Sequence, residues 1–206
     1  MAVETDREWF GGRLLHHLGD SVKLSPGQIN LLYNHFRLLL LWNSRLNLSA
    51  IRSPDEIVDR HYGESLFFAA QIPDFGKSVA DVGSGAGFPG IPVAILHPEW
   101  NVTLIESHQR KAVFLRESSR NMHNVTVIDQ RAEDVDQYFD CVVSRAVRPG
   151  DIVRLLPGLA RGIGLLLSRS DFSEIETGSS INWLSPHAIP WSNNNLCVFG
   201  VFHVER

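Results

Sequence analysis

The stretch Asp81-Val-Gly-Ser-Gly-Ala-Gly-Phe-Pro-Gly90 decides the fold of this chain. It follows an apolar run, Ser78-Val79-Ala80, and leads into a segment with a helical pattern, Ile91 to His97. Its four glycines allow the backbone to turn tightly and to approach a ligand without interference from side chains. Asp81 ends the predicted strand before this loop, and a second acid, Glu106, ends the next one. These features indicate a nucleotide-type cofactor site at the carboxyl edge of a parallel sheet.

Strands and helices alternate from Lys77 onward. The predicted strands are Ser78–Val82, Val102–Ile105, Val125–Ile128, Asp140–Ser144 and Gly164–Ser168, and the predicted helices are Gly90–His97, Gln109–Met122 and Asp151–Leu156. Apolar strands separated by helices indicate a parallel sheet with right-handed crossovers. Two further strand-like runs, Ile181–Ile189 and Leu196–Val204, are separated by turn-forming residues, which predicts an antiparallel hairpin at the sheet edge.

The first 73 residues differ, because their pattern is helical. A short amphipathic helix is predicted at Trp9–Leu18, and a second begins at Ser25-Pro26 and runs to about Trp42. Ser53-Pro54-Asp55-Glu56 has the form of a capping box, and the helix that it starts is expected to end near Pro73. We therefore expect a single α/β domain over residues 1–206, with a helical N-terminal extension (1–73) packed on a mostly parallel core (77–206).

Charge and composition limit the possible functions. The 206 residues carry a formal net charge of −4, which counts against an overall positive field for nucleic acid. Two stretches, 107–131 and 144–170, hold more arginine and lysine than acids and allow a local basic face. Cys141 and Cys197 form no CxxC pair, which predicts buried thiols and no metal site. No signal-peptide pattern or membrane-length apolar run is present, so we expect a cytoplasmic protein with no membrane partner.

The glycine loop has two interpretations. Gly85-Ala-Gly87-Phe-Pro-Gly90 matches G-x-G-x-x-G, and Glu106 follows about 20 residues later, which is typical of dinucleotide-binding proteins. The wider pattern, D-x-G-x-G-x-G from Asp81 to Gly87, resembles motif I of the class I, Rossmann-like methyltransferases that use S-adenosylmethionine. That resemblance implies that Glu106 accepts hydrogen bonds from the ribose hydroxyls, a role suited to a carboxylate.

The same loop, extended to Ile91-Pro92, resembles the signature of the RsmG family, also called glucose-inhibited division protein B. Other similar blocks follow in order: Trp42-Asn43, Asn47 to Arg52, Glu56, Arg60-His61, Ser65-Leu66, Val102 to Ser107, Arg110-Lys111, Phe114 to Arg116, Asn124-Val125, Arg131 to Glu133, Phe139-Asp140 and Val143 to Ala146. The resemblance covers about residues 28 to 148. It implies a class I fold and methylation of a guanine at N7 in small-subunit ribosomal RNA.

The resemblance also implies roles for individual residues. The cofactor-binding residues would be Asp81, Gly83, Gly85, Gly87, Phe88, Glu106, Ala132, Glu133 and Arg145, with S-adenosyl-L-methionine as the cofactor. Gly83 and Phe88 would line its methionine and ribose side, and Ala132 and Glu133 would lie against the adenine. Arg145, at the end of the fourth strand, would lie beside cofactor and target base and is the candidate catalytic residue. Arg60 and His61 are candidates for substrate binding, although His61 equally fits a histidine satisfied at an interface.

The implied chemistry needs few side chains. N7 of guanine has an exposed lone pair, so catalysis can rest on orientation, proximity and shielding from water. Because the product base is cationic, Arg145 suits a phosphate or the cofactor carboxylate better than the product. The family's usual Lys-Gly pair after the fifth strand is replaced by Ser168-Arg169, where Arg169 stands as a displaced candidate cation for the substrate. Glu64 stands where the family usually has aspartate.

Four functions remain open on the sequence alone. The first is methylation of 16S ribosomal RNA, free or assembled in the small subunit, by a monomer that has no DNA partner. The second is a small-molecule methyltransferase of the same fold, which the near-neutral charge permits. The third is a dinucleotide-dependent oxidoreductase, and the fourth is a catalytically silent cofactor-binding module. Binding of S-adenosylmethionine or NAD(H), and the salt dependence of RNA affinity, would discriminate among them.

Overall fold

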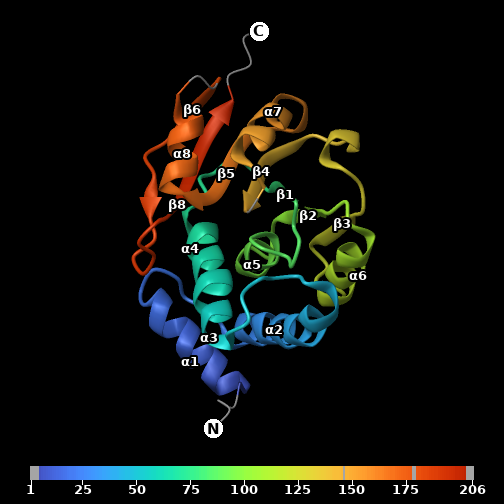
Figure 1. The fold of residues 1–206 in the computed structure, drawn as a ribbon, viewed down its shortest axis with the longest axis vertical. Helices are drawn as coiled ribbons and strands as arrows, with labels where there is room; N and C mark the ends of the chain where they lie inside the picture. Colours follow the sequence, from blue (N-terminus) through green and yellow to red (C-terminus); the bar gives the residue numbers. More distant parts are fainter. Residues whose placement is uncertain (1–4, 146, 178–179, 203–206) are drawn as a thin grey trace.

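The computed structural model describes residues 5–145, 147–177 and 180–202. Its sheet has the strand order β3-β2-β1-β4-β5-β8-β6, and β7 pairs with β8 outside that path (Figure 1). The strands are β1 Ser78–Val82, β2 Asn101–Ile105, β3 Val125–Ile128, β4 Phe139–Arg145, β5 Ala160–Ser168, β6 Ile181–Trp183, β7 His187–Ala188 and β8 Asn195–Phe202. The pairs from β3 to β5 are parallel, as the sequence predicts, and β8 runs antiparallel to β5.

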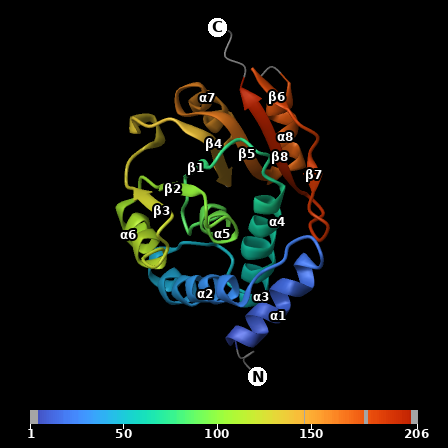
Figure 2. The same ribbon diagram turned by 180° about the vertical axis from the view of Figure 1, so that it is seen from behind.

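Helices cover both faces of this sheet (Figures 1 and 2). They are α1 Arg7–Leu18, α2 Pro26–Leu46, α3 Pro54–Glu56, the π-helix η1 Ile57–Gly63, α4 Glu64–Gln71, α5 Gly90–Leu96, α6 Gln109–Ser118, the 3-10 helix η2 Ala132–Asp134, α7 Pro149–Leu159 and α8 Arg169–Glu176. Because side chains alternate along a strand, Val79 and Cys141 pack toward the N-terminal helices. Ala80 and Val142 pack toward α7 and α8 on the opposite face.

The chain order places a ligand site at one point of this sheet. From β1 the chain adds β2 and β3 on one side, and then β4 and β5 on the other. The strand order therefore reverses between β1 and β4, whose residues Val79 and Cys141 are directly paired. In open α/β sheets, ligands bind outside the carboxyl ends of the strands at such a reversal. The loop after Val82, and Arg145 at the end of β4, stand at that point.

The N-terminal helices pack against the core through aromatic side chains. Phe10 of α1, Phe36 of α2 and Tyr62 of η1 are fully buried, with ring centroids 5.0 to 6.0 Å apart. Helix α2 begins as expected, because Ser25 and Gln28 form a capping box. At the next helix the expectation was only partly right. Ser53 accepts the backbone N–H of Glu56, but α3, η1 and α4 form three consecutive segments in place of one regular helix.

Several boundaries differ from the predicted ones. Helix α6 ends at Ser118 and not at Met122, and the hydroxyls of Ser118 and Ser119 donate to the Leu115 carbonyl in its last turn. Helix α8 was not predicted, and Ser168 caps it by accepting the N–H of Asp171. The tail contains two short strands, β6 and β7, that both pair with β8. Ala146 and Val204, which belong to predicted blocks, lie outside the described residues.

Cys141 and Cys197 are free thiols and fully buried, as predicted. Burial raises the pKa of both thiols well above the ordinary value, so neither ionises at neutral pH. Among the residues that the structure describes, no helix is long and apolar enough to cross a membrane.

Candidate active site

The glycine loop between β1 and α5 turns three times through left-handed backbone conformations. Gly83, Gly85 and Gly87 have φ values of 71°, 56° and 91°, where side-chain-bearing residues are strained. The loop is fastened to the neighbouring strand, because the N–H groups of Gly83 and Ser84 donate to the Ile105 carbonyl at 2.9 and 3.2 Å. The positive φ values of this turn therefore explain why glycine occupies these three positions.

A methyl group added to each glycine shows which side of the loop is open. At Gly83 it would overlap the side chain of Val147, and at Gly90 it would lie 2.6 Å from Oδ2 of Asp81. At Gly85 the nearest atom is the Gly83 carbonyl oxygen at 3.7 Å, an ordinary contact. The Gly85 turn is thus the part of the loop that is free to approach a ligand.

Asp81 lies behind this loop and not in a cavity wall. Its side chain is fully buried, and Oδ2 accepts the N–H of Gly90 at 3.0 Å, which joins the end of β1 to the start of α5. Oδ1 is buried with no hydrogen-bond partner among the described residues. Burial raises the pKa of Asp81 to about 7, although the hydrogen bond from Gly90 acts in the opposite sense. The predicted contact between Asp81 and the cofactor stays a prediction.

Glu106 is the acid that reaches the open side of the loop. It follows β2 and is 7% exposed. One carboxylate oxygen accepts the N–H of Gly85 at 2.9 Å, and the other accepts the N–H of His108 at 2.8 Å. Since a carboxylate has about four acceptor positions, two remain for hydroxyl groups of a ligand. Gly85 and Glu106, which are 21 residues apart in the sequence, are therefore in direct contact.

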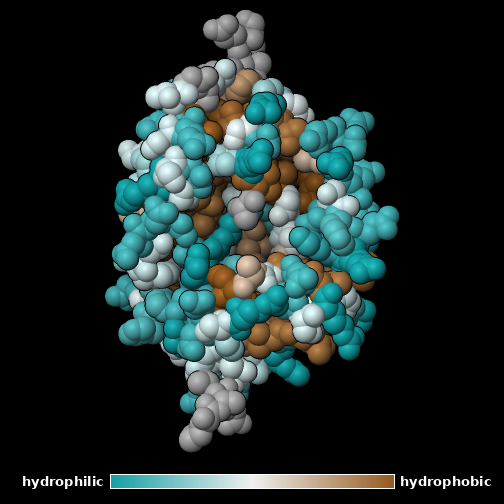
Figure 3. Space-filling view, viewed as in Figure 1, coloured by the Kyte–Doolittle hydropathy of each residue, from teal (hydrophilic) through white to brown (hydrophobic). Residues whose placement is uncertain are grey.

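A cavity of about 400 Å³ lies where these segments meet. It is lined by Val82, Gly83, Ile105, Glu106, Ser107, Gln130, Arg131, Ala132, Glu133, Val147, Asp151, Ile152, Arg154 and Leu155. Four predicted cofactor residues from three separate segments are thus brought together here: Gly83, Glu106, Ala132 and Glu133. Figure 3 shows a hollow near the middle of this face of the molecule, bordered by apolar patches. The contribution of α7 was missed, because nothing in its sequence marks it as a cavity wall.

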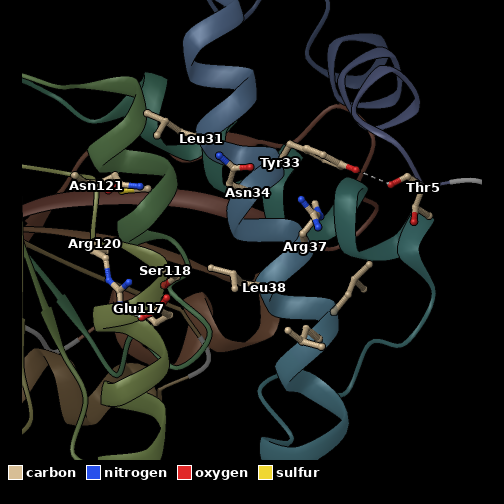
Figure 4. Close-up of a pocket in the computed structure, with 13 residues that line it drawn as sticks. Thr5, Leu31, Tyr33, Asn34, Arg37, Leu38, Glu117, Ser118, Arg120 and Asn121 are labelled. Carbon is tan, nitrogen blue, oxygen red and sulfur yellow. Dashed lines mark hydrogen bonds and ion pairs between the residues drawn. The ribbon is translucent and has the colours of Figure 1, made fainter.

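A larger cavity, of about 770 Å³, lies between α2 and α6 (Figure 4). Asn34 and Leu38 of α2 line it on one side, and Glu117 of α6 and Arg120, just beyond the end of α6, line it on the other. None of the predicted site residues lines this cavity. Size alone therefore does not identify the cofactor site, and the convergence of the glycine loop and Glu106 does.

Arg145 does not line the 400 Å³ cavity but forms a second group beside it. Its Nη2 donates to Oε2 of Glu64 at 2.7 Å, and its Nη1 donates to the Arg60 carbonyl at 2.6 Å. The Arg145 side chain is 13% exposed and that of Glu64 is 2% exposed. Burial lowers the pKa of Arg145, and the Glu64 carboxylate partly offsets that effect. The predicted catalytic residue is therefore a paired cation, held by residues of the N-terminal extension.

His61 and Phe88 lie against each other near this pair. Their rings are stacked, with centroids 4.8 Å apart and planes inclined by 16°. Nε2 of His61 is 2.7 Å from the Ser49 hydroxyl, whereas Nδ1 is buried without a partner among the described residues. Burial, followed by the charges of Arg145 and Arg60, lowers the pKa of His61 to about 3. His61 is therefore neutral at physiological pH.

His35 and Tyr62 support the loop from beneath, and the sequence analysis missed both. His35 Nε2 is 3.0 Å from the Ala86 carbonyl, and Nδ1 is 2.6 Å from the Tyr62 hydroxyl. A carbonyl can only accept, so Nε2 carries the proton and Nδ1 accepts from Tyr62. Burial lowers the pKa of His35 to about 4, which keeps this neutral form. A histidine in the apolar face of α2 gave no sequence signal for this role.

The remaining predicted residues lie at the edges of the site. The side chain of Arg60 is exposed, and its carbonyl, not its guanidinium, contacts Arg145. Arg169 is exposed at the first position of α8, just beyond the end of β5. Phe88, the residue after Gly87 in the loop, packs against the rings of His35, His61 and Tyr62 of the N-terminal helices. Within residues 5–145, 147–177 and 180–202, no group of three or more His, Cys, Asp or Glu side chains could hold a metal ion.

Comparisons with known proteins agree with this geometry. Residues 28–177 match the family described as rRNA small subunit methyltransferase G, or GidB. A relative named ribosomal RNA small subunit methyltransferase G 1, from Syntrophobacter fumaroxidans, is 39% identical over 73% of each chain. Ribosomal RNA small subunit methyltransferase G from Nitrosomonas europaea is 43% identical over 56% of this chain, and the aligned segment spans just over half of that protein, 55%.

Two solved structures share the fold at low sequence identity. A predicted O-methyltransferase from Agrobacterium tumefaciens has a TM-score of 0.56 and 20% identity, over 68% of this chain and 81% of that one. Aeropyrum pernix fibrillarin, crystallised with natively bound S-adenosyl-L-methionine, has a TM-score of 0.53 and 12% identity, over 67% of this chain and 73% of that one. The fold is that of class I methyltransferases, and the chain belongs to the rRNA small subunit methyltransferase G family.

Proposed function

We propose that this chain transfers the methyl group of S-adenosyl-L-methionine to N7 of a guanine in 16S ribosomal RNA. The family match over residues 28–177 supports ribosomal RNA as the substrate. The observation that carries the proposal is the meeting of Gly83, Glu106, Ala132 and Glu133 at one cavity in a chain of this family. These residues are far apart in the sequence, and their convergence at the carboxyl edge of the sheet is what a nucleoside-containing cofactor requires.

The residues around the cavity fit this cofactor in size and chemistry. A volume of about 400 Å³ lies within the range of about 300 to 1,000 Å³ that small-molecule sites usually have. Glu106 keeps acceptor positions for the two ribose hydroxyls after binding Gly85 and His108. Val82, Ile105 and Ile152 supply apolar wall for the adenine ring. We propose that Asp81, Gly87 and Phe88 support the loop, whereas Gly83 and Gly85 contact the cofactor.

The chemistry requires orientation more than proton transfer. When bound, S-adenosylmethionine supplies an electrophilic methyl group on a sulfonium sulfur. Guanine N7 has a free lone pair, so no side chain has to remove a proton before attack. The chain therefore has to align the two partners and exclude water. Arg145, at the end of β4 and beside the stacked pair of Phe88 and His61, is the residue that we place next to the target nucleotide.

The proposal also includes the RNA partner and the oligomeric state. We propose that a monomer acts on 16S RNA within the small subunit, in the cytoplasm, and that DNA is not a substrate. Arg60 and Arg169 have exposed side chains outside the cofactor cavity, which suits contacts with RNA phosphates. We also propose that residues 1–206 act as a single domain, since Phe10 of α1 and Val79 of β1 belong to one hydrophobic core.

The test is transfer of labelled methyl from S-adenosylmethionine to small ribosomal subunits that lack the modification, followed by nucleoside analysis. We expect 7-methylguanosine in 16S RNA. Another methylated nucleoside, or label in small molecules alone, would contradict the proposed reaction. Binding of NAD(H) without binding of S-adenosylmethionine would contradict the cofactor and point to the oxidoreductase alternative.

Two glutamate variants make this test specific to the cavity. Glu106→Ala removes the carboxylate beside Gly85, and we expect at least a tenfold loss of S-adenosylmethionine affinity by calorimetry. Glu117→Gln changes a half-buried residue of α6 that pairs with Arg120 and lies outside the 400 Å³ cavity. This control is expected to bind the cofactor like the unaltered protein. Equal affinities for all three proteins would overturn the assignment of the cavity.

A further inference from the structure

Two groups of the N-terminal extension, far from Arg145 in the sequence, hold its guanidinium. Nη1 donates to the Arg60 carbonyl in η1, and Nη2 donates to the Glu64 carboxylate at the start of α4. On its other side, Glu64 is bound by Asn195 at the start of β8, whose Nδ2 lies 3.1 Å from each carboxylate oxygen. The N-terminal extension and the tail therefore meet at the end of β4 through one buried carboxylate.

The π-helix explains how a backbone carbonyl can take part. The N–H of Glu64 donates to the carbonyls of Asp59 and His61, so it passes over the carbonyl of Arg60. In a regular α-helix that N–H would bind Arg60, four residues earlier. The wider turn leaves the Arg60 carbonyl to accept Nη1 of Arg145. Single π-helical turns of this kind are frequent at functional sites.

Glu64 also determines the charge of this region. Its carboxylate is 2% exposed, and a buried carboxylate is tolerated only when it is paired and hydrogen-bonded. Arg145 and Asn195 provide that pairing, so Glu64 cancels the charge of Arg145 beside the site. A guanidinium has five N–H donors, and the two contacts with Arg60 and Glu64 leave three for other groups. Arg145 is thus a directed donor whose own charge is paired with a buried carboxylate.

We propose that Glu64 is a positioning residue for methyl transfer: it orients and neutralises Arg145, with Asn195 as its second support. This inference rests on the proposed function. Methylation of N7 leaves a positive charge on the guanine, and an unpaired cation close to it would oppose the reaction. The Glu64 carboxylate removes that opposition while Arg145 keeps its donors. The substrate group that Arg145 would contact is a guanine nucleotide bound at the end of β4.

The test is Glu64→Gln, which keeps the side chain's shape and one acceptor oxygen but removes the charge. We expect kcat on small subunits to fall at least tenfold, KM to change less than threefold, and the melting curve to stay cooperative. The Glu117→Gln protein is the matched control and should keep its kcat. A kcat within twofold of the unaltered protein for Glu64→Gln would overturn the proposal.

A double-mutant cycle separates positioning from a merely structural role. If Glu64 acts through Arg145, the double variant Glu64→Gln/Arg145→Gln should have the same kcat as Arg145→Gln alone, within twofold. Losses that multiply would show that Glu64 acts independently and would overturn the inference. Should Glu64→Gln fail to fold, Asn195→Ala decides the matter: a kcat at least threefold lower supports the proposal, and an unchanged kcat overturns it. An inactive unaltered protein would instead refute the proposed function.

Discussion

The buried carboxyl of Asp81 predicts an unusual dependence of stability on pH. Its pKa is raised to about 7 in the folded protein, mainly by burial, against an ordinary value of 3.8. Between these two values the folded state holds a proton that the unfolded state has released. The free energy of unfolding therefore falls as the pH rises from about 4 to about 7, which is the reverse of the usual effect of a paired aspartate.

The size of the effect follows from the two pKa values. Each unit of difference between folded and unfolded pKa corresponds to about 1.4 kcal/mol once the group is ionised. From pH 5 to pH 8, the contribution of Asp81 should fall by about 3 kcal/mol. Asp81→Asn removes the titration but keeps an oxygen that can accept the N–H of Gly90. We expect the variant to gain about 3 kcal/mol relative to the unaltered protein over this range.

The assay is urea unfolding of both proteins at several pH values between 5 and 8. Any offset caused by the new amide is the same at each pH, so only the change in the difference matters. Neutral His35 and His61 contribute in the opposite sense, because their lowered pKa values stabilise the fold above about pH 6.5 and destabilise it below. They are present in both proteins and cancel. A difference that stays constant within about 0.5 kcal/mol would refute the raised pKa of Asp81.

Two further substitutions test the loop and the first helices. Gly85→Ala adds a methyl group that makes only an ordinary contact, 3.7 Å from the Gly83 carbonyl oxygen, at a φ of 56°, so we expect a loss of about 1 kcal/mol in stability but at least a tenfold loss of S-adenosylmethionine affinity; unchanged affinity would remove Gly85 from the site. In Gly90→Ala the new Cβ would lie 2.6 Å from Oδ2 of Asp81, so we expect this variant to have a lower melting temperature than the unaltered protein. Ser25→Ala removes the cap of α2 and should cost about 1 kcal/mol without changing methyl transfer, and an inactive variant would contradict a purely structural cap.

The parts of the fold that could be predicted depend on short-range pattern. The five parallel strands, the glycine loop and the acid after β2 follow from apolar runs, turn residues and the spacing of Asp81 and Glu106. The direction of a side chain at a strand end was harder to predict. Asp81 and Val82 are neighbours, yet Val82 lines the cavity and Asp81 points behind the loop to Gly90. The pleat of a strand sends adjacent side chains to opposite faces, so residue type alone did not fix the role of Asp81.

The supporting residues could not be predicted, because their partners are far away in the sequence. Glu64 meets Arg145 across 81 residues and Asn195 across 131, and His35 meets Ala86 across 51. Nothing local distinguishes such a residue from an ordinary helix position. The π-helix had no local signal either, since it differs from an α-helix only in which carbonyl each N–H selects. The replacement of aspartate by Glu64 was visible, but its meaning depended on the third partner, Asn195.

The arrangement of charges gives a physical reason for these long-range contacts. In the proposed reaction, the nitrogen–methyl bond forms as the sulfur–methyl bond breaks, and a positive charge moves from sulfur to the base. The total charge stays constant, so the site needs no group that changes its protonation. Neutral His35 and His61, and Arg145 paired with Glu64, provide surroundings of that kind. Catalysis by fixed orientation requires rigid support more than reactive groups, and here that support comes from the N-terminal helices and the tail.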